Sequence, residues 1–206
     1  MRMPVYKRFR GFLPVVVDIE TAGFDAERHA MLEIAAVLIA PNQQGKWQRF
    51  QTYAEHVLPF EGAILDKASL DFTGIDPYHP FRYAVSEQKA LQKVFKPIRA
   101  AIKSHSCSRA ILVGHNPAFD MAFLNAAIKR TGMKRNPFHA FSSFDTATLG
   151  GLVCQQTVLA KAVQALGMPW DNKQAHSAIY DAERTADLFC HIVNRWDELN
   201  PSLGLL

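Results

Sequence analysis

The sequence reads LPVVVDIET from Leu13 to Thr21. The run is short, rich in β-branched valine and free of charge until its end, which is typical of a buried strand. Asp18 and Glu20 stand two residues apart at that end, so a strand directs both carboxylates to the same face. Two carboxylates side by side repel each other, and a divalent cation with oxygen ligands resolves this repulsion. The stretch predicts a central strand that ends at a candidate metal site.

The rest of the chain predicts a sheet around this strand. Further strands are expected at 31–40, 50–58, 110–113 and 142–145, and helices at 66–76, 86–104, 117–130, 158–166 and 177–196. Pro97 is expected to kink or break the second helix. Three strands in succession predict an antiparallel meander, and the later alternation of helices and strands predicts an α/β fold with a mixed sheet flanked by helices. Because no linker or repeat interrupts the pattern, residues 1–206 are expected to form a single domain.

Composition sets the broad class. The chain has 206 residues, of which 49% are hydrophobic, and a formal net charge of +4. This fits one compact domain with a mild preference for polyanions. The three scattered cysteines contain no CxxC pair and predict reduced thiols. Neither an apolar run of membrane-spanning length nor a signal-type segment is evident, so the expected location is the cytoplasm, with no membrane partner.

Two more acidic residues and one histidine follow at helix starts. Asp120 ends the stretch GHNPAFD, directly after the predicted strand at 110–113, and Asn116 is expected to cap the helix before Pro117. His176 and Asp181 begin and end HSAIYD at the start of the last helix. Five residues do not place two side chains on one helical face, so His176 is expected on the preceding loop, folded back over the helix start.

The individual residues have ordinary interpretations as well. An isolated Asp-x-Glu pair is often two solvated charges, an acid at a helix start often complements the helix dipole, and a lone histidine often lies in a loop. Together, four carboxylates and a histidine at strand ends and helix starts predict a site for two divalent ions that hydrolyses phosphodiesters. One ion would activate water and the other would stabilise the leaving oxygen, while His176 would accept the proton of the water.

Three segments carry a family resemblance. DIET at 18–21, NPAFD at 116–120 and HSAIYD at 176–181 resemble, in order and spacing, the three motifs of the DEDD exonucleases. The branch with a tyrosine places it four residues before the last aspartate, where this chain has Ser177, so the resemblance is to the histidine-bearing DEDDh branch. Longer matches at 8–12, 20–24, 134–139 and 174–178 extend the resemblance over nearly the whole chain. The members of the branch that share these matches trim stable RNAs.

The resemblance implies an RNase H-like fold with a five-stranded mixed sheet. It also implies a homodimer that removes nucleoside 5′-monophosphates from single-stranded 3′ ends of tRNA precursors, other stable RNAs and DNA. Two Mg²⁺ ions, with Mn²⁺ as a substitute, are the implied cofactors. The implied metal ligands are Asp18, Glu20, Asp120, Asp181 and His176. Asp120 and His176 are the implied catalytic residues, with His176 as general base.

The family pattern also implies residues that hold the substrate. Base-stacking positions correspond to Phe24, Phe72, Phe119 and Phe141, and aromatic stacking tolerates any base. Ala68 stands four residues before Phe72, where the family commonly has a glutamate that contacts a terminal base. The base preference at the 3′ end therefore does not follow from the resemblance.

A basic patch is implied as a second RNA-binding surface that feeds the active site of the other subunit. Its residues are Arg8, Arg10, Lys103, Arg109 and Lys134. Any one of them is also compatible with an ordinary solvated surface, and phosphate contacts would make the affinity fall with salt.

Two other functions remain open on the sequence alone. The first is a DNA proofreading or repair exonuclease like the polymerase III epsilon subunit, although the basic N-terminal segment and the four phenylalanines favour RNA. The second is a catalytically inactive fold used as a binding module, which the presence of all five site residues disfavours.

Overall fold

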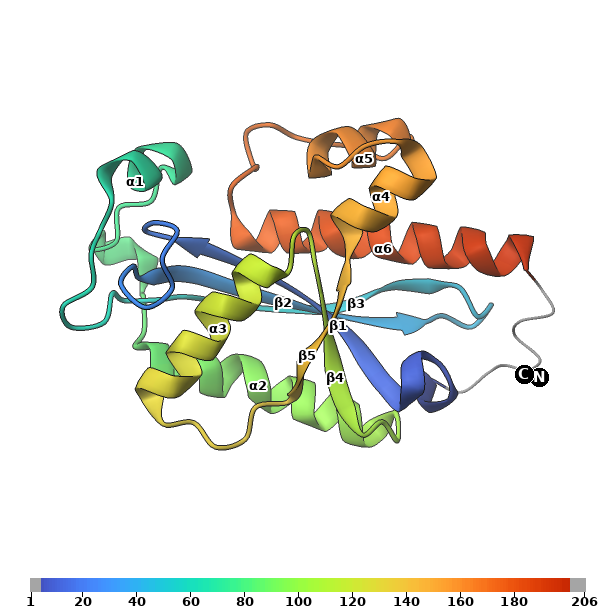
Figure 1. Cartoon of the computed structure of the whole chain (residues 1–206), viewed down its shortest axis with the longest axis horizontal. Coiled ribbons are helices and arrows are strands. Elements are labelled where there is room, and N and C mark those ends of the chain that lie inside the picture. Colours follow the sequence, from blue (N-terminus) through green and yellow to red (C-terminus); the bar gives the residue numbers. More distant parts are fainter. Residues whose placement is uncertain (1–4, 201–206) are drawn as a thin grey trace.

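The computed structural model describes residues 5–200 and contains one five-stranded sheet in the order β3-β2-β1-β4-β5 (Figure 1). The strands are β1 (Phe12–Thr21), β2 (Met31–Pro41), β3 (Trp47–His56), β4 (Arg109–Gly114) and β5 (Phe138–Asp145). The first three strands form an antiparallel meander, while β4 lies parallel to β1 and β5 parallel to β4. The predicted strands and the mixed sheet are confirmed.

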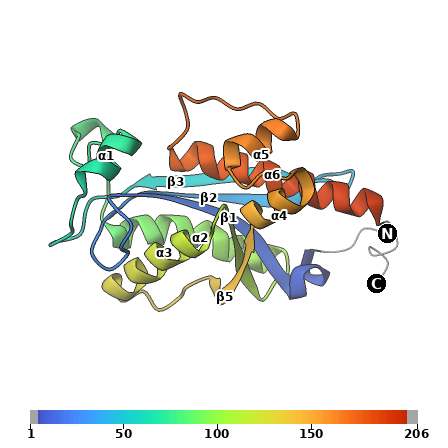
Figure 2. The same cartoon turned by 45° about the horizontal axis from the view of Figure 1, so that its top comes forward.

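Helices cover both faces of the sheet. They are α1 (Lys67–Thr73), α2 (Glu87–Ser104), α3 (Ala118–Thr131), α4 (Thr146–Cys154), α5 (Leu159–Ala165) and α6 (Ala178–Leu199), with short 3-10 turns at Val5–Lys7, Phe9–Gly11 and Pro80–Arg82. In Figures 1 and 2, α6 crosses one face, α2 and α3 lie on the other, and α4 and α5 pack outside α6. α1 stands apart at one end, near the finish of β1. No helix within residues 5–200 is long and apolar enough to cross a membrane.

The core explains why β1 is the middle strand. Val15, Val16 and Val17 are almost wholly excluded from solvent, and the aromatic rings of Phe95 on α2, Phe123 on α3 and Phe189 on α6 fill the space on either side. A strand buried on both faces reads as a continuous apolar run, which is the pattern that predicted it.

Four details differ from the sequence prediction. α2 continues through Pro97, so the predicted break at this residue is wrong. Pro117 occupies the N-cap position of α3, and Asn116 adopts a left-handed φ of 64° with its backbone N–H donating to Asp145 Oδ1 at 3.0 Å. The predicted capping role of Asn116 is therefore wrong. β5 begins four residues before the predicted start, and α4 was missed because TATLGGLVC holds two glycines and begins immediately after a strand.

Candidate active site

β1 carries the first two acids to the end of the sheet. Asp18 and Glu20 are half-buried and alternate with the buried Ile19, and the β1–β2 register shifts between Glu20 and Thr21, where the strand finishes. The alternation directs both carboxylates to the face that α6 covers. β1 is therefore apolar along most of its length and carries its charged residues only at its end.

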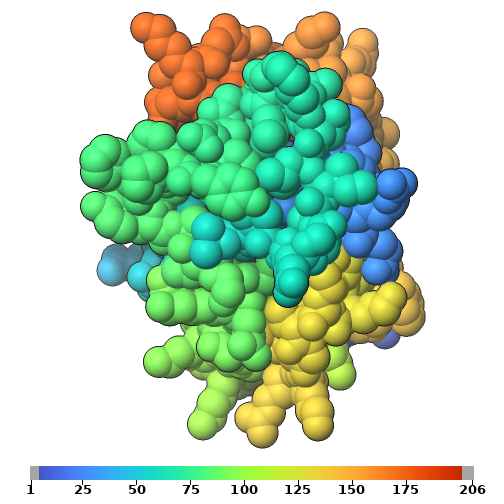
Figure 3. Space-filling view, turned by 90° about the vertical axis from the view of Figure 1, so that its left-hand side faces the viewer, coloured from blue at the N-terminus to red at the C-terminus, as the bar shows by residue number. Residues whose placement is uncertain are grey.

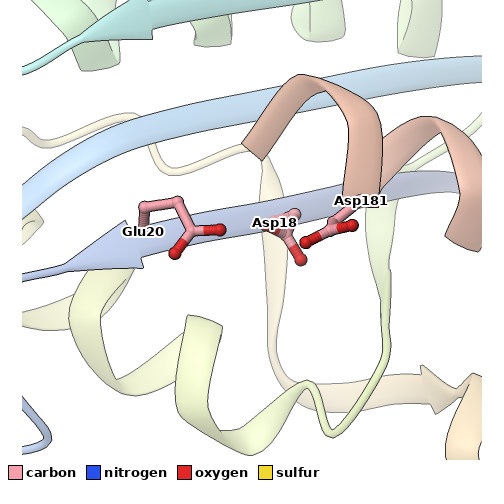
Figure 4. Close-up of side chains that lie close together, drawn as sticks. All are labelled: Asp18, Glu20 and Asp181. Carbon is pink, nitrogen blue, oxygen red and sulfur yellow. The ribbon is translucent and has the colours of Figure 1, made fainter. Parts of the chain in front are cut away.

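α6 delivers the third acid. Ser177 is the N-cap residue, and Asp181 lies in the first turn of the helix. Carboxylate oxygens of Asp18, Glu20 and Asp181 all lie within 4.8 Å of one another, and Figure 4 shows the Asp181 side chain coming from α6 toward the pair on β1. Residues 163 positions apart in the chain are thereby combined in one acidic cluster, which we call the carboxylate cluster.

The carboxylates of the cluster are partly buried and repel one another, and both effects raise their pKa values. Burial raises the pKa of Asp18 well above its ordinary value, and the charges of Asp120, Glu20, Asp181 and then Glu33 raise it further. Burial, followed by the charges of Asp181 and Glu33, raises the pKa of Glu20 to about 7. Carboxylates in this state favour a bound cation or a shared proton.

Asp181 shows that the cluster fits a metal ion. Its Oδ2 accepts a hydrogen bond from the backbone N–H of His176 at 2.9 Å, but its buried Oδ1 has no hydrogen-bond partner among the described residues. Burial raises the pKa of Asp181, and the contacts with His176 oppose that rise. An orphaned, buried carboxylate oxygen facing two other carboxylates is the donor set that hard divalent cations prefer.

α3 carries the fourth acid, whose charge acts on Asp18 but whose oxygens are not among those of the cluster that lie within 4.8 Å of one another. Asp120 lies in the first turn of α3 and is only 5% exposed. Burial raises its pKa to about 8; the backbone N–H groups of Asp120 and Ile19 counteract the rise, and the charge of Glu20 adds to it. Gly114, at the end of β4, leaves room for this arrangement, because a Cβ there would lie 3.0 Å from Pro117 Cβ and 3.5 Å from Asp120 Oδ2.

His176 lies on the loop before α6, as the spacing predicted. It adopts a left-handed φ of 65°, which folds its backbone N–H back onto Asp181. The imidazole is exposed, and its ring centre lies 4.3 Å from that of Phe72. The histidine ring thus lies between the acidic cluster and α1.

Three of the four predicted stacking phenylalanines meet at one cavity. It has a volume of about 370 Å³ and is lined by Phe24, Phe72 and Phe119 together with Glu20 of the carboxylate cluster. Phe24 and Phe72 are 84% and 68% exposed. Phe141 lies elsewhere: it is on β5, with its ring 4.5 Å from that of His139.

The predicted basic residues lie toward the opposite end of the sheet. Arg109 starts β4, next to Phe12 at the start of β1. Arg10, Lys103 and Lys134 are also exposed, in the segments that lead into β1, out of α2 and into β5. Arg8 differs, because both of its terminal nitrogens bind the carboxylate of Asp197 at 2.7 Å.

One acidic residue was missed by the sequence prediction. Glu33 on β2 is the register partner of Glu20; its Oε1 lies 3.0 Å from His56 Nδ1, and its Oε2 accepts a hydrogen bond from the backbone N–H of Ala178 at 3.2 Å. It therefore joins β2 to the start of α6. A lone charge in the apolar run MLEIAAVLIA was the signal that could have found it.

The mixed five-stranded sheet flanked by helices is the fold of solved exonucleases of the DEDDh class. Among solved structures, E. coli exonuclease I in complex with a dT13 oligonucleotide has a TM-score of 0.69 at 15% identity, covering 93% of this chain and 43% of that chain. The nuclease domain of 3′hExo, a DEDDh family member, bound to rAMP, has a TM-score of 0.65 at 19% identity, covering 88% of this chain and 92% of that chain. At these identities the likeness is one of fold.

Sequence relatives identify the family within the exonucleases to which the chain belongs. An exonuclease family model matches residues 15–189. Ribonuclease T of Marinobacter nauticus is 59% identical over 196 residues, which cover 95% of this chain and 89% of the relative. Ribonuclease T of Photorhabdus laumondii is 56% identical over 192 residues, which cover 93% and 88%. The chain belongs to the ribonuclease T family of 3′→5′ exonucleases.

Proposed function

We propose that the chain trims single-stranded 3′ ends of tRNA precursors, other stable RNAs and DNA by Mg²⁺-dependent hydrolysis, releasing nucleoside 5′-monophosphates. The observation that carries the proposal is the carboxylate cluster with its orphaned Asp181 oxygen, directly beside an aromatic cavity that contains Glu20. A charged, desolvated centre next to a stacking site suits a nucleotide whose phosphate must be attacked.

Four carboxylates would hold the ions. Asp18, Glu20 and Asp181 would bind them directly, with Asp120 completing the set from the first turn of α3. When bound, two Mg²⁺ or Mn²⁺ ions supply a nucleophilic water at neutral pH and stabilise charge on the attacking and leaving oxygens. The same ions would offset the burial, and the mutual repulsion, that raise the pKa values of Asp18 and Glu20.

His176 would act as the general base. Its exposed ring is anchored through the backbone rather than through the imidazole, so the ring can turn from Phe72 toward the attacking water. Imidazole is the side chain that most often accepts a proton in general base catalysis. The backbone bond to Asp181 would keep the base close to the acidic centre throughout.

The aromatic cavity would hold the last nucleotides. Phe24 and Phe72 are largely exposed to solvent, whereas Phe119 is partly buried, with its ring 6.3 Å from that of Phe24. Stacking contributes about 1–3 kcal/mol per base without reading the sequence. Ala68 also lines the cavity and contributes only a methyl group, so no carboxylate at this position would discriminate among bases. Phe141 would stack a base outside the cavity.

A homodimer would explain the separation of acidic and basic residues. Arg10, Arg109, Lys103 and Lys134 lie toward the start of the parallel strands, whereas the carboxylates lie at their end. In a dimer, the basic patch of one copy would hold the RNA body while the other copy cuts its end. We propose that residues 1–206 act as a single exonuclease domain in this assembly, in the cytoplasm.

The test uses 5′-labelled RNA with a short duplex and a single-stranded 3′ overhang, incubated with the full chain in Mg²⁺ or in EDTA. We expect a Mg²⁺-dependent ladder that shortens from the 3′ end and stalls near the duplex, with nucleoside 5′-monophosphates as the product. A parallel DNA substrate gives the ratio of the two rates. An intact RNA beside a degraded DNA would contradict the RNA assignment, and two intact substrates would contradict the catalytic proposal.

A further inference from the structure

The segment between α1 and α2 exposes three aromatic side chains within six residues. Tyr78, Phe81 and Tyr83 are 67%, 76% and 81% exposed. Exposed aromatic rings that follow one another closely along the chain can mark an interaction site, because a large apolar face gains most from being covered. None of the three has a role in the site described above. We call this group the aromatic platform.

The platform is held rigidly, unlike an ordinary surface loop. Arg82 anchors it from within, donating to the backbone oxygen of Leu32 at 2.7 Å and to that of Pro77 at 3.0 Å. Val85 fixes its far end through backbone hydrogen bonds with His56 and Leu58. A rigid aromatic surface loses little conformational entropy when a ligand covers it.

Tyr83 adopts a backbone conformation that opposes its own side chain. Its φ of 51° lies in the left-handed region, where a bulky residue is disfavoured by its Cβ. Such strain persists only where surrounding structure imposes it, and it concentrates at functional positions. A glycine would satisfy this backbone without strain, so the presence of an exposed tyrosine is informative.

The platform continues into the neighbourhood of the proposed active site. Tyr83 and Arg82 line a cavity of about 250 Å³ whose other walls include Glu33, Ser177 and Ile179. Ser177 follows His176 directly, and Glu33 pairs with Glu20 across the sheet. Figure 3 shows the green segment after α1 beside α1 itself, below the orange segment that leads into α6.

We propose that the aromatic platform binds bases of the single-stranded substrate several nucleotides away from its 3′ terminus. The proposal rests on the proposed function and adds a second stacking surface to it. The cavity is just smaller than the ~300–1,000 Å³ of a pocket for a whole small molecule, which suits part of a longer ligand. Arg82 and Lys93 line the cavity together with Glu33 and Glu55, and Lys93 is paired to Glu55 at 2.8 Å, so these charges balance and the aromatic ring is the feature that favours a base.

A single strand is the occupant that the surroundings favour. Its bases offer unpaired faces that stack on aromatic rings whatever the base sequence. The cavity lined by Tyr83 also adjoins the carboxylate cluster, because it contains Glu33, the register partner of Glu20, and Ser177 at the start of α6. A second copy of the chain would cover the same rings, so the experiment must separate the two.

The experiment compares the intact chain with Tyr83→Gly and Tyr83→Phe. Tyr83→Gly removes the ring while suiting the positive φ, so the fold is retained. Tyr83→Phe keeps the ring and restores stacking. Phe50→Ala is the matched control, because Phe50 is 70% exposed on β3 and lines a different cavity. Each protein is assayed for kcat/KM on a single-stranded trinucleotide and on a 12-nucleotide strand, and for binding of the labelled 12-nucleotide strand in EDTA.

We expect Tyr83→Gly to lower kcat/KM and affinity for the long strand by about tenfold, as for one lost base stack. Hydrolysis of the trinucleotide, and all results with Tyr83→Phe and Phe50→Ala, should match the unaltered chain. Equal losses on both lengths, or none, would overturn the platform. Dissociation of a dimer by Tyr83→Gly in sedimentation would overturn it in favour of a subunit contact. If the unaltered chain hydrolyses neither strand, the proposed function fails, and the binding arm still decides the platform.

Discussion

The two ends of the parallel strands β1, β4 and β5 carry opposite charge, and they differ in how that charge is held. At one end, Asp18 and Asp120 are embedded in the fold, and burial raises the pKa of each carboxyl. At the other end, Arg109 and Lys103 are exposed to solvent. One end is a desolvated, pre-arranged cluster, and the other is a set of separate surface charges.

This difference separates the residues whose positions are imposed by the folded core from those that matter only when a substrate approaches. A buried carboxylate disfavours folding until a cation arrives, so its position must be imposed by the core around β1. An exposed lysine costs nothing to fold and gains only when a phosphate approaches. Substitutions should therefore have large, local effects at the acidic end and small, additive effects at the basic end.

Asp18→Asn should give the largest effect. It removes the central oxygen donor of the carboxylate cluster, and ions that each supply several kcal/mol would be lost or misplaced, which lowers kcat by about 10⁴-fold or more. Single-turnover hydrolysis of labelled RNA measures it. Glu61→Gln is the control, because Glu61 is an exposed acid in the loop before α1. Retained activity in Asp18→Asn would remove the cluster from the reaction.

His176→Ala should rank next. Loss of a general base lowers the rate by about 10²–10⁴-fold while binding of the strand is nearly unchanged. His191→Ala, which alters an exposed histidine on α6, should behave as the unaltered chain. A rate equal to that control would exclude His176 as the base.

The basic patch should show a graded dependence on salt. With four phosphate contacts and a slope near −0.7 per contact, affinity for single-stranded RNA should fall about 50-fold between 50 and 200 mM salt. Alanine at Arg109, Lys103 or Lys134 should each reduce the slope by about 0.7 and leave kcat unaltered. Arg8→Ala should change the slope least, since its guanidinium is already paired with Asp197. An affinity for RNA that does not change with salt concentration would contradict the assignment of these residues as a phosphate-binding patch.

Metal-free stability should separate Asp120 from Asp145. The pKa of Asp120 is raised from 3.8 to about 8, so its stabilising protonated form is complete below pH ~4 and is lost as the pH rises through 8. Burial acts to raise the pKa of Asp145, but hydrogen bonds from Thr148, Asn116 and Ala147 outweigh it and hold that pKa below its ordinary value. Asp145 therefore stabilises the fold above its ordinary pKa and loses this contribution as the pH falls.

In EDTA at pH 8, Asp120→Asn should accordingly raise Tm and Asp145→Asn should lower it. For the buried Asp120, a change of roughly 1–3 kcal/mol in the free energy of unfolding, at about 2–4 °C per kcal/mol for a chain of this length, shifts Tm by about 2–12 °C. Thermal unfolding followed by circular dichroism at pH 5 and pH 8 measures both variants. A higher Tm for Asp145→Asn than for Asp120→Asn would reverse the assignment of buried and satisfied charge.

Sequence patterns predicted the sheet well because a strand that is buried on both faces consists almost entirely of apolar residues. Val15–Val17 and the run from Met31 are continuous apolar stretches, and such stretches exclude most alternatives to a buried strand. α4 was invisible, since two glycines weaken its helical pattern and its start depends on Asp145 accepting a hydrogen bond from Ala147 N. Pro97 was misjudged because tertiary packing of α2 overrides a local preference.

The residues of the candidate site could be predicted from the sequence, but their arrangement in space could not. The residues of the carboxylate cluster could be chosen from their places at strand ends and helix starts. Their meeting depends on the crossing of α6 over β1, which no local pattern encodes. Glu33 escaped notice because its importance comes from its register with Glu20, and register is a property of two strands together.

The central claim is that the carboxylate cluster binds divalent metal ions, and calorimetric titration with Mg²⁺ at pH 7 tests it most directly. Because the pKa of Glu20 is about 7 and that of Asp120 about 8, both carry protons part of the time in the free protein. Mg²⁺ binding should therefore release protons, measured as different heats in two buffers of unequal ionisation enthalpy, and Asp18→Asn should abolish the binding. Binding unaffected by Asp18→Asn, or no binding at millimolar Mg²⁺, would contradict the account.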